Sequence, residues 1–164
     1  ELSQFLTNHN ILMACIQETE LSEESNLRPF QNFKTLRKDR PNRDGGGLIT
    51  LIHHSITYKE SETDFFPGDN TIEHQVIHVE LNGAELIICN IYIPPSSSCP
   101  SNYSPNFDSL FAITSDILIM GDFNAHNSSW FSNTSCRAAE ERGNDIIDAL
   151  TDSTLTTINK DSPT

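Results

Sequence analysis

Residues 116–126 of the chain read DILIMGDFNAH, an apolar run that passes directly into a polar turn. The run from Asp116 to Met120 is typical of a buried strand, because it is short, continuous and bounded by turn-forming residues. Asp122 and Asn124 follow two residues apart, so in extended backbone their side chains point to the same side. The end of a strand can hold such polar groups in fixed positions. The stretch therefore predicts a sheet with a polar site at one end.

Other segments outward from this stretch have strand or helix patterns. Asn82-Gly83 predicts a two-residue hairpin turn, because both residues tolerate positive φ. A segment at 56–58 is predicted to continue or pair with the strand before it. The predicted strands are residues 11–16, 47–53, 76–81, 85–92 and 155–159, and the predicted helices are residues 22–27, 106–114 and 138–151. Helices mixed with mostly antiparallel strands indicate an α/β or α+β protein with a β core.

The composition describes an acidic globular chain of 164 residues with 36% hydrophobic residues. No apolar run approaches the roughly 20 residues of a membrane span. The net charge of −13 argues against a simple nucleic-acid binder, although six of the ten basic residues fall between Arg28 and Arg43. That basic stretch is interpreted either as a contact for phosphates or as a solvated loop. The four cysteines lack metal-ligand spacing, and we expect reduced core residues of an intracellular protein.

Glu18 follows the apolar run at 11–16 much as Asp122 follows its own strand. Two carboxylates and the Asn124 amide offer the oxygen ligands that suit a hard divalent cation. Zinc is not favoured, since no His or Cys joins them at ligand spacing. Taken singly, each residue has a simpler interpretation: Asp122 and Asn124 as turn residues, Glu18 as a solvated surface residue, and Tyr92 as a packing aromatic.

Four motifs in a fixed order give the sequence a recognisable pattern. In chain order they are Ile16-Gln17-Glu18-Thr19, Gly45-Gly46-Gly47, Asn90-Ile91-Tyr92-Ile93-Pro94-Pro95 and Gly121-Asp122-Phe123-Asn124-Ala125-His126. This pattern resembles the endonuclease/exonuclease/phosphatase superfamily. Together with Trp130, Arg142-Gly143 and the segment at 159–164, it looks most like the endonuclease domain of jockey-type non-LTR retrotransposons.

The resemblance implies a role for several of these residues. Glu18 would be a metal ligand, and Tyr92 would contact the scissile phosphate through its hydroxyl. Asp122 would orient or deprotonate the attacking water, and Asn124 would hold the phosphate or position Asp122. Weaker candidates for substrate binding are His126, Asn127, Arg40 and Arg43, and for His126 and Asn127 a turn role is an open alternative. The glycines at 45–47 are not a phosphate-binding loop, since no Lys-Ser/Thr follows, and are expected to permit a bend or a close strand approach.

The fold implied is a four-layer α/β/β/α sandwich of the deoxyribonuclease I type, incomplete, in one domain over residues 1–164. Relative to the family, that domain is expected to lack the first strand and the C-terminal Ser-Asp-His part; no Ser-Asp-His occurs in the sequence.

The function implied is Mg²⁺-dependent nicking of DNA, with Mn²⁺ as an alternative metal, in a nuclear polyprotein that also carries a reverse transcriptase. No membrane partner is expected. Two alternatives stand beside it. The chain could be a catalytically inactive retroelement remnant, or a superfamily member that acts on abasic DNA, RNA or inositol phosphates.

Overall fold

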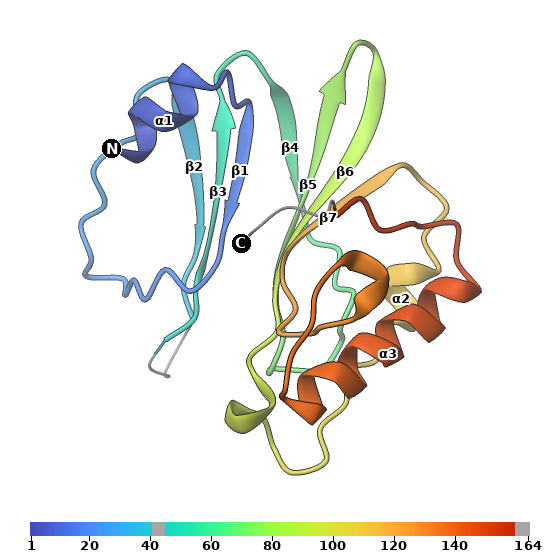
Figure 1. Cartoon of the computed structure of the whole chain (residues 1–164). Coiled ribbons are helices and arrows are strands. Elements are labelled where there is room, and N and C mark those ends of the chain that lie inside the picture. Colours follow the sequence, from blue (N-terminus) through green and yellow to red (C-terminus); the bar gives the residue numbers. More distant parts are fainter. Residues whose placement is uncertain (41–44, 160–164) are drawn as a thin grey trace. The chain divides into compact units, whose positions relative to one another are not determined.

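The computed structural model describes residues 1–40 and 45–159 and forms two compact units (Figure 1). The first unit comprises residues 1–63, 73–92 and 115–121, and the second comprises residues 64–72, 93–114 and 122 onward. Each unit has its own buried residues and is described by itself.

The first unit contains two β-sheets. One has the strand order β1-β3-β2, with β1 at Met13–Ile16, β2 at Phe33–Lys38 and β3 at Leu48–His53, all antiparallel. The other has the order β4-β5-β6-β7, with β4 at Thr57–Ser61, β5 at Glu73–Leu81, β6 at Ala84–Tyr92 and β7 at Ile117–Asp122. Strands β4, β5 and β6 pair antiparallel. The hydrogen bonds from Ile87 N to Asp116 O and from Ile93 N to Asp122 O advance along both chains together, so β7 runs parallel to β6.

Strand β3 is buried on both of its faces, which explains its continuous apolar sequence. Its inner face packs against β5 and β6 of the other sheet. The core between the sheets contains Leu36, Ile52, Ile77, Val79 and Ile88. The two packed sheets that the sequence predicted are therefore present.

Helix α1, Leu2–Asn8, covers the outer face of the first sheet (Figure 1). Its only buried residue, Leu6, joins a second core cluster with Phe33, Ile49 and Leu51. Ile49 and Leu51 alternate along β3 with the inward-facing Thr50 and Ile52, as a period of two requires. The first unit thus has a helix layer and two sheet layers, and the predicted α/β sandwich class is confirmed.

Several predicted elements differ from the structure. No helix forms at 22–27; Ser22 and Ser25 make a turn, because the side chain of Ser25 accepts from Ser22 N and the carbonyls of both residues bind Arg37. Residues 57–61 belong to the second sheet and do not pair with β3. Residues 155–159 form no strand. Strand β2 was not predicted, since four of the six residues in its sequence FKTLRK are polar. The Asn82-Gly83 hairpin is confirmed, with φ of 53° and 80°.

The second unit is built around helix α3, Arg137–Thr151, and the short helix α2, Asp108–Phe111, which contact each other. An aromatic cluster surrounds Phe107, whose ring lies 5.3 Å from Phe111, 6.3 Å from Phe123 and 6.4 Å from Phe66 between centroids. Three apolar residues of the helix predicted at 106–114 are buried: Phe107, Leu110 and Phe111. Two 3₁₀ turns, η1 at Ser96–Ser98 and η2 at Ser128–Trp130, complete the unit. Among the helices in the described part of the chain, none has the length and apolar character of a membrane span.

The predicted placement of Cys15 and Cys89 in the apolar core is confirmed. Burial raises the pKa of the Cys15 thiol to about 11 and that of Cys89 to about 12. Cys136, by contrast, is exposed at the start of α3.

Alkylation of the folded protein at pH 8 should discriminate among these thiols. We expect iodoacetamide to modify Cys136 at least about a hundredfold faster than Cys15 or Cys89, because the thiolate is the reactive form and burial suppresses it. Mass spectrometry of tryptic peptides measures the rates, and unfolding in urea should make them similar. Equal modification of Cys89 and Cys136 without urea would contradict the placement of Cys89.

Candidate functional site

The first unit brings together two of the predicted site residues, Glu18 and Tyr92. Tyr92 is the last residue of β6 and is 3% exposed, and its hydroxyl donates a hydrogen bond to Glu18 Oε1. Glu18 follows β1 and is exposed, with the left-handed φ of 51°. A buried phenol therefore fixes one oxygen of an exposed carboxylate, and a non-glycine residue keeps a strained backbone only where its surroundings enforce it.

The triple glycine supplies part of this enforcement. Thr19 N donates to Gly47 O at 3.2 Å, and Glu20 N donates to Gly46 O at 2.8 Å. The three glycines have φ of 75°, 76° and 88°, and a Cβ on Gly47 would lie 2.5 Å from Thr19 Oγ1. The predicted role of this segment, a bend and a close strand approach, is confirmed.

A buried polar network fixes the residue before Glu18. Gln17 Nε2 donates to Asn90 Oδ1 at 2.6 Å, and Asn90 Nδ2 donates to Thr50 Oγ1 and Ile49 O, both at 3.1 Å. The hydroxyl of Thr50 then donates to Gln75 Oε1 at 2.7 Å. Asn90 and Thr50 are at most 1% exposed, so each polar atom needs its partner. Gln17 and Asn90 were quoted from the sequence only as members of motifs, and this network was not predicted. The signal for it was two polar residues, Thr50 and Asn90, inside otherwise apolar strands.

The second unit brings together Asp122 and Asn124. Asn124 N donates to Asp122 Oδ1 at 2.8 Å, and Asn124 Nδ2 donates to Asp122 Oδ2 at 3.3 Å. The same amide also donates to Ile93 O at 3.0 Å. The proximity was predicted from extended backbone, but the structure achieves it by a turn, since Asn124 has φ 45°. Of the two alternatives left open for Asn124, this geometry favours the positioning of Asp122.

Arg142 of α3 is 4% exposed and donates hydrogen bonds to the backbone of the turn that contains Asp122 and Asn124. Its Nη1 donates to Pro94 O and to Phe123 O, each at 2.9 Å. Its Nη2 lies 3.4 Å from Ser96 Oγ and 3.7 Å from Cys99 Sγ. A buried guanidinium that binds carbonyls of two chain segments, here the segments after β6 and after β7, fixes the backbone of both. Arg142 was noted in the sequence only as part of the family pattern, and its place on the buried face of α3 was not predicted.

His126 and Asn127 have internal partners in the second unit. His126 Nδ1 lies 2.7 Å from Ser132 Oγ, and Asn127 Nδ2 donates to Asn144 Oδ1 at 2.8 Å. Asn127 Oδ1 also accepts from Ser129 N and so caps η2. Gly143 allows α3 to approach this segment, since a Cβ there would lie 2.6 Å from the carbonyl carbon of His126. These contacts agree with the turn role; DNA contact by either residue stays a prediction.

The two arginines predicted to bind substrate have different outcomes. Arg43 lies outside the described residues. Arg40 forms an ion pair with Glu73 and lies over the Tyr92 ring, with its guanidinium carbon 5.8 Å from the centroid. A phosphate contact by Arg40 stays a prediction, and its charge already has a protein partner.

The donor chemistry suits a hard cation. Within the described residues no group of three or more His, Cys, Asp and Glu gathers to hold a metal, whereas Glu18 and Asp122 are each exposed. Mg²⁺ is commonly held by one or two carboxylates, with water and substrate phosphate supplying the other ligands. A closed zinc site would need more protein ligands than that.

The chain is similar to known proteins in both sequence and structure. Residues 86–164 match the family model described as endonuclease-reverse transcriptase. Over 97% of its length the chain is similar to the solved endonuclease domain of TRAS1, a telomere-specific non-LTR retrotransposon, with a TM-score of 0.64, 15% identity and coverage of 67% of that chain. A comparison with curated protein sequences gave no match. The resemblance to a retrotransposon endonuclease predicted from the motifs is confirmed, and so is the fold.

We expect Arg142→Met to lower the free energy of unfolding by about 2–4 kcal/mol, because the carbonyls of Pro94 and Phe123 would lose a charged donor in a buried place. Urea denaturation followed by circular dichroism gives the value. The matched control is Arg137→Met on the same helix. The Arg137 side chain is 89% exposed and pairs only with Glu141, so its loss should cost about 0.5 kcal/mol or less. Equal effects of the two substitutions would show that Arg142 does not anchor the turn.

Proposed function

We propose, from the relationship of residues 86–164 to the endonuclease-reverse transcriptase family, that this chain hydrolyses DNA phosphodiesters in the presence of Mg²⁺. The observation that carries the proposal is the exposure and the hydrogen bonding of two carboxylates. Glu18 and Asp122 are both exposed, and each is held by an uncharged hydrogen-bond donor, Tyr92 or Asn124. An exposed carboxylate in a fixed orientation is suited to bind a cation or to accept a proton.

The proposed chemistry divides the work among four side chains. Glu18 would bind the metal through its carboxylate, and the hydroxyl of Tyr92 would orient that carboxylate or donate to a phosphate oxygen. Asp122 would accept the proton of the attacking water, as a general base must. Asn124, through its backbone and side-chain amides, would keep both oxygens of Asp122 in place. When bound, Mg²⁺ supplies stabilisation of the negative charge that develops on the phosphoryl oxygens.

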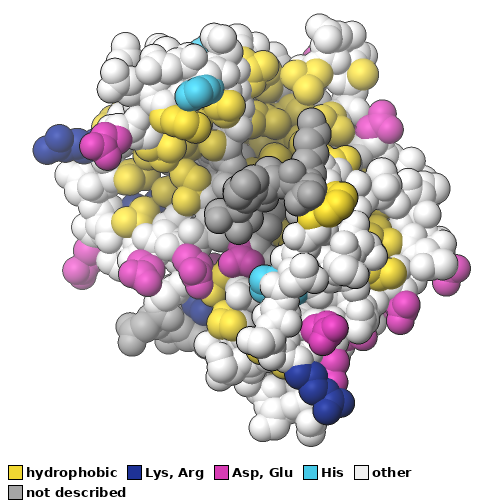
Figure 2. Space-filling view, in the orientation of Figure 1, with side chains coloured by type: hydrophobic (Ala, Val, Ile, Leu, Met, Phe, Trp, Pro, Cys, Tyr) yellow, Lys and Arg dark blue, Asp and Glu magenta, His cyan; other side chains and the backbone are white. Residues whose placement is uncertain are grey.

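The proposal also covers the setting of the reaction. The family description joins an endonuclease to a reverse transcriptase, so we propose that the substrate is nuclear target DNA and that a reverse transcriptase acts in the same polyprotein. Asp and Glu are spread over the face of the molecule in Figure 2, whereas Lys and Arg are sparse there. With a net charge of −13, DNA binding would depend strongly on the divalent cation.

Nicking of supercoiled plasmid tests the function. We expect the purified chain to produce open circles with Mg²⁺ and none with EDTA. Asp122→Asn should lower the rate by about 10²–10⁴-fold, the usual contribution of a general base, and Glu18→Gln should raise the Mg²⁺ concentration needed for half-maximal rate. Asp148→Asn, which removes one exposed carboxylate of α3, is the matched control and should leave the rate unchanged.

Two further substrates separate the remaining alternatives. Preferential cleavage of an oligonucleotide with an abasic site would redirect the proposal to DNA repair chemistry, and phosphate release from inositol phosphates would redirect it to small substrates. If wild-type protein cleaves none of these at any Mg²⁺ or Mn²⁺ concentration, the proposed activity fails and the chain is an inactive relative of the endonucleases.

A further inference from the structure

Four of the five described basic residues between Arg28 and Arg43 have a partner within the protein, although Lys34 and Lys38 are exposed. Lys34 lies over the Tyr58 ring, with Nζ 5.2 Å from the centroid. Lys38 Nζ donates to His74 O at 2.8 Å. Arg37 and Arg40 are in ion pairs whose side chains are only 10–22% exposed. These side chains are therefore not those of a purely solvated loop, whereas a phosphate contact by them stays a prediction.

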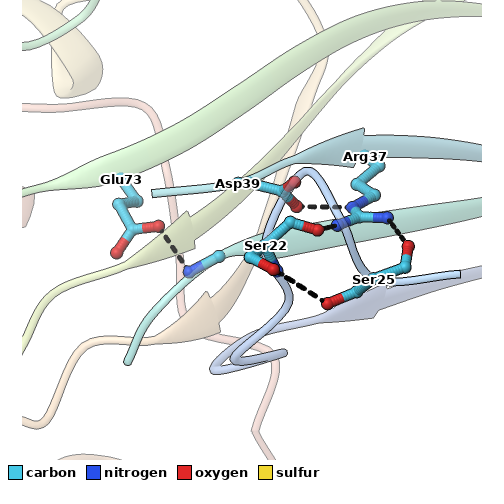
Figure 3. A network of polar contacts seen from close by, with 6 residues as sticks. Ser22, Ser25, Arg37, Asp39 and Glu73 are labelled. Carbon is cyan, nitrogen blue, oxygen red and sulfur yellow. Dashed lines mark hydrogen bonds and ion pairs between the residues drawn. The ribbon is translucent and has the colours of Figure 1, made fainter. Parts of the chain in front are cut away.

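Arg37 holds the segment that follows Glu18. Its Nε pairs with Asp39 Oδ1 at 2.5 Å, its Nη1 donates to Ser25 O at 2.9 Å, and its Nη2 donates to Ser22 O. Figure 3 shows the guanidinium between the Asp39 carboxylate and the two serines. Asp39 neutralises the charge, and the remaining donors fix two carbonyls of a loop that has no secondary structure of its own.

Arg40 reaches the Glu18 segment through Glu73. The side chains of Arg40 and Glu73 are 14% and 10% exposed, and they form an ion pair. The other oxygen, Glu73 Oε2, accepts from Gly47 N at 2.7 Å (Figure 3). The carbonyl of Gly47 in turn accepts from Thr19 N, the residue after Glu18. A Cβ on Gly46 would lie 2.7 Å from Arg40 Nε, so this glycine allows the pair to sit against the backbone.

Arg40 also reaches Tyr92, the hydrogen-bond partner of Glu18. Its guanidinium faces the Tyr92 ring at 5.8 Å, within the range of a cation–π interaction. The ion pair therefore contacts both supports of Glu18: the glycine backbone beside it and the phenol that binds it. Release of Arg40 to a DNA phosphate would leave Glu73 buried without its partner, which is strongly unfavourable.

We infer that Arg37, Arg40 and Glu73 are positioning residues for Glu18 and Tyr92, and that this part of the basic stretch is a scaffold for the site instead of a DNA-binding surface. The consequence for catalysis rests on the proposed function, whereas the structural claim does not. The two claims can therefore be tested separately.

Hydrogen–deuterium exchange tests the structural claim. In Arg40→Gln and in Glu73→Gln, the amides of Thr19 and Glu20 should exchange at least about tenfold faster than in wild type, since their acceptors on Gly46 and Gly47 lose their support. Arg37→Gln should accelerate exchange at Ser25. Amides of β5 and β6 serve as internal references for a folded protein. The matched control is Arg28→Gln, which removes an exposed positive charge from the same stretch and should change none of these rates.

DNA binding and nicking complete the test. Removal of a residue that contacts phosphate should reduce the slope of log affinity against log salt concentration by about one. Removal of a positioning residue should leave that slope unchanged and should lower kcat more than it raises KM. Arg40→Lys keeps the charge and should restore part of both exchange protection and kcat.

Three results would overturn the inference: unchanged exchange at Thr19 and Glu20 in Arg40→Gln, a salt slope that falls by one in that variant, or equal acceleration in Arg28→Gln. If the wild-type protein neither binds nor nicks DNA, the proposed function fails. The hydrogen–deuterium exchange experiment then still decides whether Arg37, Arg40 and Glu73 position the Glu18 segment.

Discussion

The first unit depends on strand β3, which is covered on both faces. Its outward residues pack against Leu6 of α1 and Phe33 of β2, and its inward residues meet the second sheet through Ile77 and Ile88. A strand in that position cannot shift by one residue, because a shift would exchange the two faces. The segment that enters it, Gly46–Gly47, is therefore fixed in space, and the backbone after Glu18 binds to this segment. The position of a catalytic candidate follows from the register of a core strand.

Two charged residues of the described part, Glu73 and Arg142, are buried, and both bind backbone groups. The chain carries 23 acidic and 10 basic residues, so acidic partners outnumber the Lys and Arg side chains. Arg142 instead binds carbonyls, and Arg40 pairs with the acid Glu73, whose second oxygen binds a backbone amide. A guanidinium suits both tasks because it offers several donors in a rigid plane and stays charged when buried. In both units the arginine supports a backbone segment that precedes or follows a proposed catalytic side chain.

The sequence predicted what depends on local pattern or on motif order. The predicted strand at 76–81 is part of β5, the Asn82-Gly83 pair identified the hairpin, and four ordered motifs gave the resemblance that led to the correct fold. It missed what depends on long-range partners. The helix expected at 22–27 does not form because Arg37, twelve residues or more away, binds its carbonyls. Strand β2 was missed because its polar residues make ion pairs and ring contacts that periodicity does not represent. Arg142 was expected in no structural role, since a buried arginine runs against composition rules.

Glu18 and Asn124 share a property that connects these observations. Both are non-glycine residues with positive φ, 51° and 45°, a conformation that costs on the order of 1 kcal/mol or more. In each case neighbouring groups hold the strained residue: Tyr92 and Gly47 around Glu18, and Asp122 with Ile93 around Asn124. Positive φ also occurs outside the motifs, for example at Asn82 of the hairpin turn, so at Glu18 and Asn124 it describes how the side chain is directed and is not by itself evidence of a functional demand. Two of these neighbours, Gly47 and Ile93, act through backbone carbonyls, which a search for acidic, basic and metal-binding side chains does not consider.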